Sequence, residues 1–259
     1  MAKRKMAAEK KPQKHFKSSV IASRQDKGIR EMAPLAPFIV SGGKNTERYY
    51  FQHISSLFAQ YPFEVRPRFF GKESKYTEEF PLRIKEILRE DADAKIFCVF
   101  DWDTIRGNDE NLKRHNVFVK QIKSYIDNGQ IILCPSMPSF EYWFLLHFKN
   151  MTRLITTCEE ASKLLNPYMK SYFSQKNINL FDILKSEKYL KKSDWVENLC
   201  SDGKLDAAIK RAEDNIKAAE DAGELKNQSY SFVYKAFKRD NAYVTLQRTY
   251  ARDGHHGTL

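Results

Sequence analysis

The sequence predicts an α/β fold in which a mostly parallel sheet is flanked by helices and followed by a helical C-terminal extension. Three observations support this prediction. Short apolar runs alternate with helical patterns over residues 37–148, which is typical of β-α units. The run at residues 95–100 is apolar almost throughout, as expected of a strand buried on both faces. After residue 157 the patterns are helical.

The first β-α unit begins at residues 38–40, an apolar run that stops at a Ser-Gly-Gly turn. A helical pattern then covers residues 45–58, with apolar side chains at helical spacing. The second unit combines a strand at residues 64–70 with a helix at about residues 77–89, which carries its apolar side chains on one side.

The third strand, at residues 95–100, ends at Asp101-Trp102-Asp103, and a helix at residues 116–126 follows. The fourth strand covers residues 130–134 and leads into a loop rich in proline and serine. The remaining elements are expected to be helices, at residues 140–148, 158–165, 180–190, 204–222 and 232–237.

Composition divides the chain into a basic flexible leader, an α/β core, a helical region packed on that core and a C-terminal tail. These parts are expected at residues 1–35, 36–150, 151–237 and 238–259. The first 34 residues hold ten Lys/Arg against three acidic residues, which is +7 of the formal net charge of +11. Two interpretations stay open for the leader, a solubilising tail or a non-specific attraction to phosphates.

Several classes of protein are excluded. The 259 residues are 42% hydrophobic, which is too much for a disordered chain, and no apolar run approaches the ~18 residues of a spanning helix. The N-terminus lacks the apolar region of a secretory signal. The four cysteines form no CxxC pair, as expected of ordinary thiols in a reducing cytoplasm. We therefore expect a soluble cytoplasmic protein without a membrane partner.

Acidic side chains follow the strands at the edge where their carboxyl ends meet. Asp101 and Asp103 are two positions apart, so on an extended segment their side chains share one side. Glu47 lies in the first turn of its helix, and Glu141 follows the fourth strand. Carboxylates gathered at one edge repel unless a cation neutralises them, and Mg²⁺ (or Mn²⁺) is the usual cation where phosphates are handled. A helix-dipole role for Glu47, with Asn45 or Thr46 as the cap, stays open.

The turn formed by Gly42, Gly43 and Lys44 resembles a phosphate-binding loop, and we expect it to bind the phosphate of a ligand. It lacks the G-x-x-x-x-G-K-[ST] spacing of a P-loop, which argues against an ATPase. The sequence also lacks G-x-S-x-G and H-E-x-x-H, so a serine hydrolase and a zinc protease are not expected.

Taken together, these motifs resemble the RloB-like family, a branch of the Toprim superfamily, over roughly residues 36–237. The segments that carry the resemblance lie at residues 40–51, 99–103, 136–148, 166–170, 207–212 and 229–234. The resemblance implies a Toprim core with a Mg²⁺-dependent nuclease centre that cleaves RNA or DNA. It also implies a role in anti-phage defence beside an ABC-type ATPase partner. A homo-oligomer is compatible with the sequence.

The resemblance also implies roles for the acidic residues. Asp101 and Asp103 would be the principal metal ligands. Glu47 matches the second Glu of the family's E-G-x-x-T-E turn and would support a second metal or orient water. Glu141 matches the acidic position of the F-E-x-W block and would be either a further ligand or a residue that caps or pairs inside the core.

The chain departs from the family pattern at Gly42, which stands where the family usually has the first Glu of that turn. That Glu is normally the leading candidate for a general base or a metal ligand. Its absence removes one negative charge and should weaken metal binding. Two hypotheses therefore stay open: an active metal-dependent nuclease, or a catalytically degenerate protein that binds nucleic acid, a nucleotide or a protein partner without hydrolysis.

A few residues near these motifs allow both a functional and a structural interpretation. Trp102 either stacks on a base or is buried under the edge of the sheet. Arg106, which follows the D-x-D pair, either meets a phosphate or belongs to a solvated loop. His147 ends an apolar helix, where a hydrogen-bonded core histidine is favoured over a catalytic one.

Overall fold

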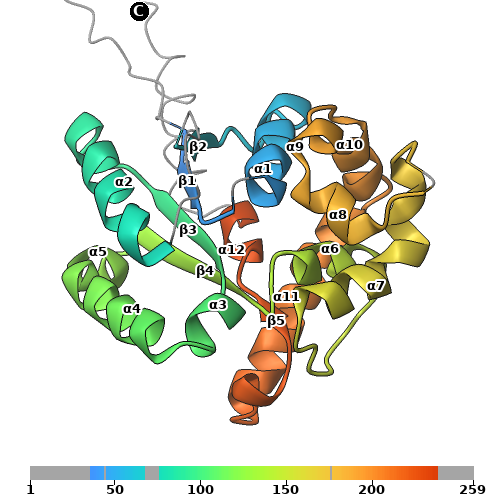
Figure 1. Ribbon diagram of the computed structural model, residues 1–259. Coiled ribbons are helices and arrows are strands. Elements are labelled where there is room, and N and C mark those ends of the chain that lie inside the picture. Colours follow the sequence, from blue (N-terminus) through green and yellow to red (C-terminus); the bar gives the residue numbers. More distant parts are fainter. Residues whose placement is uncertain (1–35, 44, 68–75, 176, 239–259) are drawn as a thin grey trace, which may run out of the picture. The chain divides into compact units, whose positions relative to one another are not determined.

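The computed structural model of the protein describes residues 36–43, 45–67, 76–175 and 177–238 (Figure 1). The expected basic leader, Lys44, and the expected tail beyond residue 238 lie outside the described residues, as does the end of the second expected strand at residues 68–70. Within the described residues, no helix is both long enough and apolar enough to cross a membrane.

The described part contains one five-stranded sheet, which confirms the predicted α/β fold. Its strands are β1 (Phe38–Ser41), β2 (Glu64–Arg66), β3 (Ile96–Asp101), β4 (Ile131–Met137) and β5 (Tyr230–Ser231). They lie in the order β2-β1-β3-β4-β5; the first four are parallel, and β5 pairs antiparallel with β4. The chain moves outward from β1 to β2 and then returns to β3 on the other side of β1. The gap between the carboxyl ends of β1 and β3 is therefore the topological switch point, where α/β sheets bind ligands.

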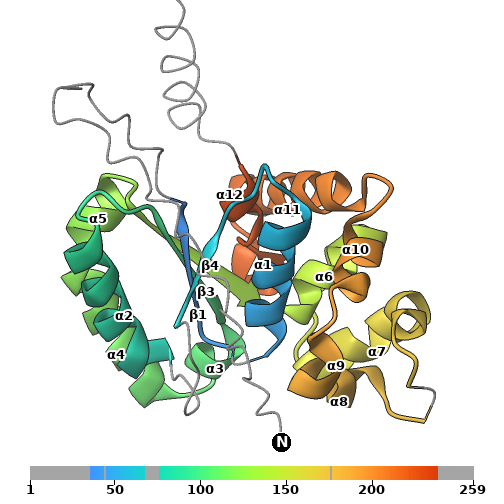
Figure 2. The same cartoon turned by 90° about the horizontal axis from the view of Figure 1, so that it is seen from above.

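Helices cover both faces of the sheet (Figure 2). One face carries α2 (Tyr76–Glu90), α4 (Asp109–Gln121) and α5 (Lys123–Asp127), and the other carries α1 (Thr46–Leu57), α6 (Glu141–Phe148), α11 (Lys204–Asp221) and α12 (Tyr234–Phe237). The remaining helical elements are α3 (Asp103–Arg106), α7 (Cys158–Met169), η1 (Lys170–Tyr172), α8 (Leu180–Lys185), α9 (Glu187–Leu190), α10 (Asp194–Cys200) and η2 (Leu225–Asn227).

The strands divide their side chains between two cores. Because successive side chains of a strand point to opposite faces, Val40 and Cys98 join the core under α2 and α4, whereas Ile39 and Val99 join the core under α1 and α6. Nearly every residue of β3 is buried, as expected of a central strand covered on both sides.

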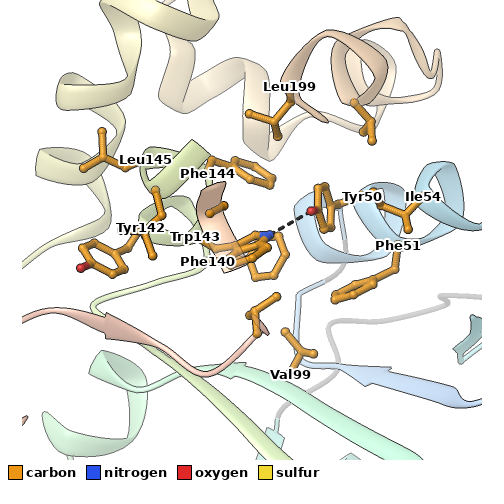
Figure 3. Close-up of a cluster of buried hydrophobic side chains, with 14 of the residues drawn as sticks. Tyr50, Phe51, Ile54, Val99, Phe140, Tyr142, Trp143, Phe144, Leu145 and Leu199 are labelled. Atoms are coloured by element: carbon orange, nitrogen blue, oxygen red, sulfur yellow. Dashed lines mark hydrogen bonds between the residues drawn. The ribbon is translucent and has the colours of Figure 1, made fainter. Parts of the chain in front are cut away.

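The larger core is built around α6, whose first seven residues are all buried. Figure 3 shows its aromatic side chains packed against those of α1, and the Trp143 indole N–H donates a 3.0 Å hydrogen bond to the Tyr50 hydroxyl. Truncating a large aromatic side chain in such a core typically costs ~3–5 kcal/mol. This packing fixes the N-termini of α1 and α6 relative to the sheet, so the acidic residues at those ends are held in place.

His147 belongs to this core. It is 2% exposed, and its Nδ1 lies 3.0 Å from the carbonyl oxygen of Trp143. Burial lowers the pKa of His147 to about 3, so the imidazole is neutral at physiological pH. His147 therefore has the structural role that the sequence favoured.

The structure differs from the sequence-based prediction at β4 and β5. Strand β4 runs through Pro135 to Met137, where a loop was expected, because the carbonyl of Pro135 still accepts a 2.9 Å hydrogen bond from the amide of Phe232. Only helices were expected after residue 157, yet Tyr230–Ser231 forms β5. A strand of two residues has no periodicity that the sequence can reveal.

The helical prediction also needs three corrections. The expected helix at residues 116–126 begins earlier, because the side chain of Asn108 accepts hydrogen bonds from the amides of Glu110 and Asn111 and so caps α4. It is divided at Ile122, so α5 follows as a separate element. Helix α10 was not expected from the sequence.

Candidate functional site

Four carboxylates gather at the switch point of the sheet, and we call them the carboxylate rim: Glu47, Asp101, Asp103 and Glu141. Glu47 lies in the first turn of α1, and Asp101 is the last residue of β3. Asp103 begins α3, and Glu141 begins α6. The structure thus brings all four predicted acidic residues to one edge. Their roles as metal ligands or catalytic groups stay predictions.

Asp101 is the central member of the rim. Its Oδ1 accepts a 2.8 Å hydrogen bond from the backbone amide of Phe140, just before α6. The amides of Trp102 and Asp103 donate to the carbonyls of Ser136 and Pro138, at 2.8 and 3.2 Å. These bonds attach the segment after β3 to the segment after β4, so Asp101 has one fixed orientation.

The surroundings of Asp101 oppose its ionisation. Burial raises its pKa well above the ordinary value, and the charges of Glu47, Glu141 and Asp103 raise it further. The amide of Phe140 acts in the opposite direction. Because Asp101 experiences the other three carboxylates, the rim is an electrostatically connected group rather than four independent side chains.

Glu47 is 6% exposed, and its carboxyl group lies over Gly43. Burial raises its pKa to about 7, with a further contribution from Glu141, while the backbone amides of Glu47 and Gly43 lower it. Glu47 therefore keeps its proton to higher pH than an ordinary glutamate does. A simple helix-dipole role does not require such burial, because exposed acidic residues serve that role equally well.

The N-terminus of α1 is attached to α8 rather than capped. The Asn45 side chain donates to the carbonyl of Lys185 at 2.6 Å, and the Thr46 hydroxyl donates to the carbonyl of Leu184 at 2.7 Å. Asn45 occupies the N-cap position of α1, as expected of one of the two candidates, but its side chain makes no capping hydrogen bond. The two bonds instead fix Glu47 relative to a segment about 140 residues later.

Asp103 has an oxygen without a hydrogen-bond partner. Its Oδ1 is buried and unsatisfied in the described part of the chain. Burial raises the pKa of Asp103 and Glu141 raises it further, whereas the amide of Thr104 and the charge of Lys185 lower it. A buried carboxylate oxygen of this kind costs free energy unless a cation or a proton satisfies it.

Glu141 is 5% exposed and accepts a 2.7 Å hydrogen bond from the Ser139 hydroxyl. The thiol of Cys158, at the start of α7, lies beside it: burial raises the pKa of Cys158, and the charge of Glu141 raises it further. Glu141 thus belongs to the rim and is also hydrogen-bonded within the core, so both interpretations of this residue have structural support.

Three neighbours of the rim were not predicted from the sequence: Ser139, Cys158 and Lys185. The only signal for Ser139 was its place in the loop after β4. Cys158 and Lys185 come from α7 and α8, and their contacts with the rim depend on tertiary packing that no local pattern encodes.

The amides of the glycine turn bind other groups of the protein. The amide of Gly42 donates to the carbonyl of Val99 at 2.9 Å, and the amide of Gly43 is directed at Glu47. The expected phosphate-binding role of Gly42 and Gly43 therefore has no free amide donor to support it, and Lys44 lies outside the described residues.

The residues of the rim fit a hard divalent cation in chemistry. They offer carboxylate oxygens, which Mg²⁺ and Mn²⁺ prefer, and Asp103 has an unsatisfied buried oxygen. Within the described residues, however, no group of three or more His, Cys, Asp or Glu side chains is arranged closely enough to hold a metal ion. The rim as it stands is a set of mutually repelling carboxylates, and the metal stays a prediction.

Comparison with known proteins gives one match. A family model described as RloB-like protein matches residues 37–239, which is most of the chain and includes every member of the carboxylate rim. No curated protein and no solved structure matches the chain.

Proposed function

The chain belongs to the RloB-like family, and on that premise we propose that it is a Mg²⁺-dependent nuclease of the Toprim type, which cleaves phosphodiester bonds of RNA or DNA. The observation that supports this proposal most is the carboxylate rim at the switch point of the sheet. Raised pKa values at Glu47, Asp101 and Asp103 show that ionising these carboxyls is costly, and a site that handles a divalent cation and a phosphate is the usual reason for such an arrangement.

In this proposal Asp101 and Asp103 hold the principal Mg²⁺ (or Mn²⁺), and Glu47 supports a second ion or orients water. When bound, the metal supplies Lewis-acid stabilisation of charge on the phosphodiester and lowers the pKa of a water molecule. Glu141 joins the ligands or, through Ser139, keeps the rim in its geometry.

The residues of the chain also provide proton transfer and positioning. With a pKa of about 7, the Glu47 carboxylate takes a proton near neutral pH more readily than an ordinary glutamate does, which suits a general base. The amide of Phe140 orients Asp101 by its 2.8 Å hydrogen bond to Oδ1.

The wider biological role in this proposal is that of an anti-phage defence effector in the cytoplasm, working with an ABC-type ATPase partner. This part is supported by the family resemblance alone. Because a nuclease that acts as an effector must be restrained until infection, we expect cleavage to depend on the partner. A homo-oligomeric assembly fits the same role.

The decisive experiment incubates the full chain, with and without the partner ATPase, with tRNA and with DNA in Mg²⁺, Mn²⁺ or EDTA. We expect cleavage in the metal-containing samples and a loss of about 100-fold or more in Asp101→Asn. Asp206→Asn, which changes an exposed carboxylate of α11, is the matched control and should cleave normally. Cleavage that survives Asp101→Asn, or that is absent under every condition, rejects the proposal.

Gly42 favours a second candidate, a degenerate Toprim protein that binds nucleic acid, a nucleotide or a protein partner without hydrolysis. The rim has four carboxylates where the family pattern would supply a fifth at position 42. Calorimetric titration with Mg²⁺ and Mn²⁺ separates the two candidates. Tight metal binding that Asp101→Asn abolishes argues against the degenerate form, whereas nucleic-acid binding without metal binding or cleavage supports it.

A further inference from the structure

A pocket of about 370 Å³ opens next to the carboxylate rim, and its size suits a small ligand. Trp102, which lies between Asp101 and Asp103 in the chain, forms one part of its lining. The complete lining consists of Trp102, Arg106, Met137, Leu225, Lys226 and Tyr230. These residues come from the segment after β3, the end of β4, and η2 with β5, so the pocket lies at the carboxyl end of the sheet.

The pocket has an aromatic and apolar interior. Met137 and Tyr230 face each other as a register pair of β4 and β5, and both are buried. Trp102 is partly exposed, and its ring packs edge-on against His115 at a centroid distance of 5.1 Å. A flat aromatic surface that is held from behind and partly open to solvent is suited to stacking on a planar ligand.

The mouth of the pocket is cationic. Arg106 and Lys226 are both exposed, and neither takes part in the ion pairs found among the described residues. The positive charge of Arg106 partly offsets the burial that raises the pKa of Tyr230 to about 12, which places the guanidinium near the Tyr230 hydroxyl. The described lining contains no acidic side chain. Aromatic rings can stack on a nucleobase while neighbouring cations bind its phosphate, so this combination suits a nucleotide.

We propose that this pocket binds one unpaired nucleotide of the substrate, with the base against Trp102 and Tyr230 and the phosphate against Arg106 and Lys226. The inference rests on the proposed function and narrows its substrate class to single-stranded nucleic acid, or to an unpaired position in a folded RNA. A base paired in a duplex is stacked on its neighbours and cannot enter. Because Trp102 is the chain neighbour of both Asp101 and Asp103, a nucleotide held against its ring lies close to the rim, although no member of the rim lines the pocket.

Binding is measured on the full chain in EDTA, so that the result is independent of cleavage. The probes are fluorescently labelled single-stranded RNA and DNA and duplexes of the same sequence, followed by anisotropy. Of the three tryptophans, Trp143 and Trp195 are at most 2% exposed, so quenching of intrinsic fluorescence by unlabelled oligonucleotide reports on Trp102. We expect single strands to bind more tightly than duplexes and to quench this fluorescence.

Four variants test the assignment. Arg106→Gln and Lys226→Gln should each weaken single-strand binding about 5-fold or more and reduce the slope of log K against log salt by ~0.7. Trp102→Ala should weaken binding about 10-fold or more, and Trp102→Phe should abolish the quenching while retaining most of the affinity. Lys85→Gln, which removes an equal charge from an exposed position of α2 outside the pocket, is the control and should bind normally.

Different results would reject the pocket assignment and the nuclease proposal. The pocket assignment is wrong if Arg106→Gln and Lys226→Gln weaken single-strand binding no more than Lys85→Gln does. It is also wrong if duplexes bind as tightly as single strands, or if no oligonucleotide binds. Should Trp102→Ala fail to fold, the exposed Arg106 and Lys226 still decide the question. Single-strand binding through the pocket without any cleavage supports the assignment and rejects the nuclease.

Discussion

The carboxyl group of Glu47 occupies the space directly above the α-carbon of Gly43, where the side chain of any other residue would begin. The peptide unit of Gly43 also directs its amide at that carboxylate. Glycine is therefore required at position 43 by the close approach of an acidic side chain, and not by its backbone angles. This contact, made within the first turn after β1, fixes the position of Glu47 in the rim.

Replacing Gly43 by Ala should displace Glu47 without unfolding the protein. A β-carbon at position 43 would overlap the carboxyl group, and the flexible end of the Glu47 side chain yields more easily than the backbone. We expect the affinity for Mn²⁺, measured by calorimetry, to fall about 10-fold or more. Gly42→Ala is the matched control, because its β-carbon would meet Phe100 and Val99 at an ordinary 3.7 Å. Equal metal affinity in both variants would show that the position of Glu47 is unimportant.

Glu47→Gln should stabilise the metal-free protein at alkaline pH. At pH values well below 4.5 the carboxyl is protonated in the folded and unfolded states alike. As the pH rises towards about 7 the unfolded chain loses this proton first, so the free energy of unfolding falls; above pH 7 the loss is complete, at about 3 kcal/mol. Gln at this position avoids that loss.

Chemical denaturation at pH 4.5 and pH 8 in EDTA measures the effect. Glu47→Gln and the unsubstituted protein should differ by less than about 1 kcal/mol at pH 4.5, and the variant should be more stable at pH 8 by up to about 3 kcal/mol. Glu197→Gln, at an exposed position of α10, serves as the control and should show no such dependence. A Glu47→Gln variant that is less stable than the unsubstituted protein at pH 8 would contradict the raised pKa.

Metal binding should release protons. A carboxylate must be ionised to bind a cation, yet Glu47 and Asp101 hold their protons to unusually high pH. Calorimetric titration with Mg²⁺ at pH 6, in two buffers of different ionisation enthalpy, should therefore give different apparent heats that correspond to about one proton or more released. The part released by Glu47 should decrease at pH 8, above its pKa of about 7, and the total release should be smaller in Asp101→Asn. Identical heats in both buffers would mean that the cation binds elsewhere.

Much of the fold could be predicted from the sequence, because it rests on local patterns. The runs at residues 38–40 and 95–100 are apolar and short, and helical patterns follow them. The proximity of Glu47 and Asp101 could be predicted as well, since parallel strands bring their carboxyl ends to one edge of the sheet. The family match supports the same assignment over residues 37–239.

The rest depends on contacts between segments that are far apart in the chain. Strand β5 contributes Tyr230 to the pocket, but a two-residue strand leaves no pattern. Lys185 reaches the neighbourhood of Asp103 only because Asn45 and Thr46 bind the end of α8. The sequence predicted that Gly43 binds a phosphate. In the structure the carboxyl group of Glu47 lies over the α-carbon of Gly43, and the Gly43 amide is directed at that carboxyl group. Such relationships follow from packing, which no local spacing encodes.

Gly42→Glu tests whether the rim is otherwise complete. Position 42 accepts a β-carbon without overlap, since that atom would lie 3.7 Å from its nearest neighbours. The added carboxylate should lower stability in EDTA by repelling the rim, and Mg²⁺ should restore that stability, because a cation offsets the repulsion. Metal affinity should rise, and cleavage of single-stranded substrate should appear or increase. Gly42→Gln, of equal size and without charge, separates the effect of charge from that of bulk. If Gly42→Glu binds no more metal than Gly42→Gln does, position 42 does not face the rim, and the glycine there cannot explain a loss of catalysis.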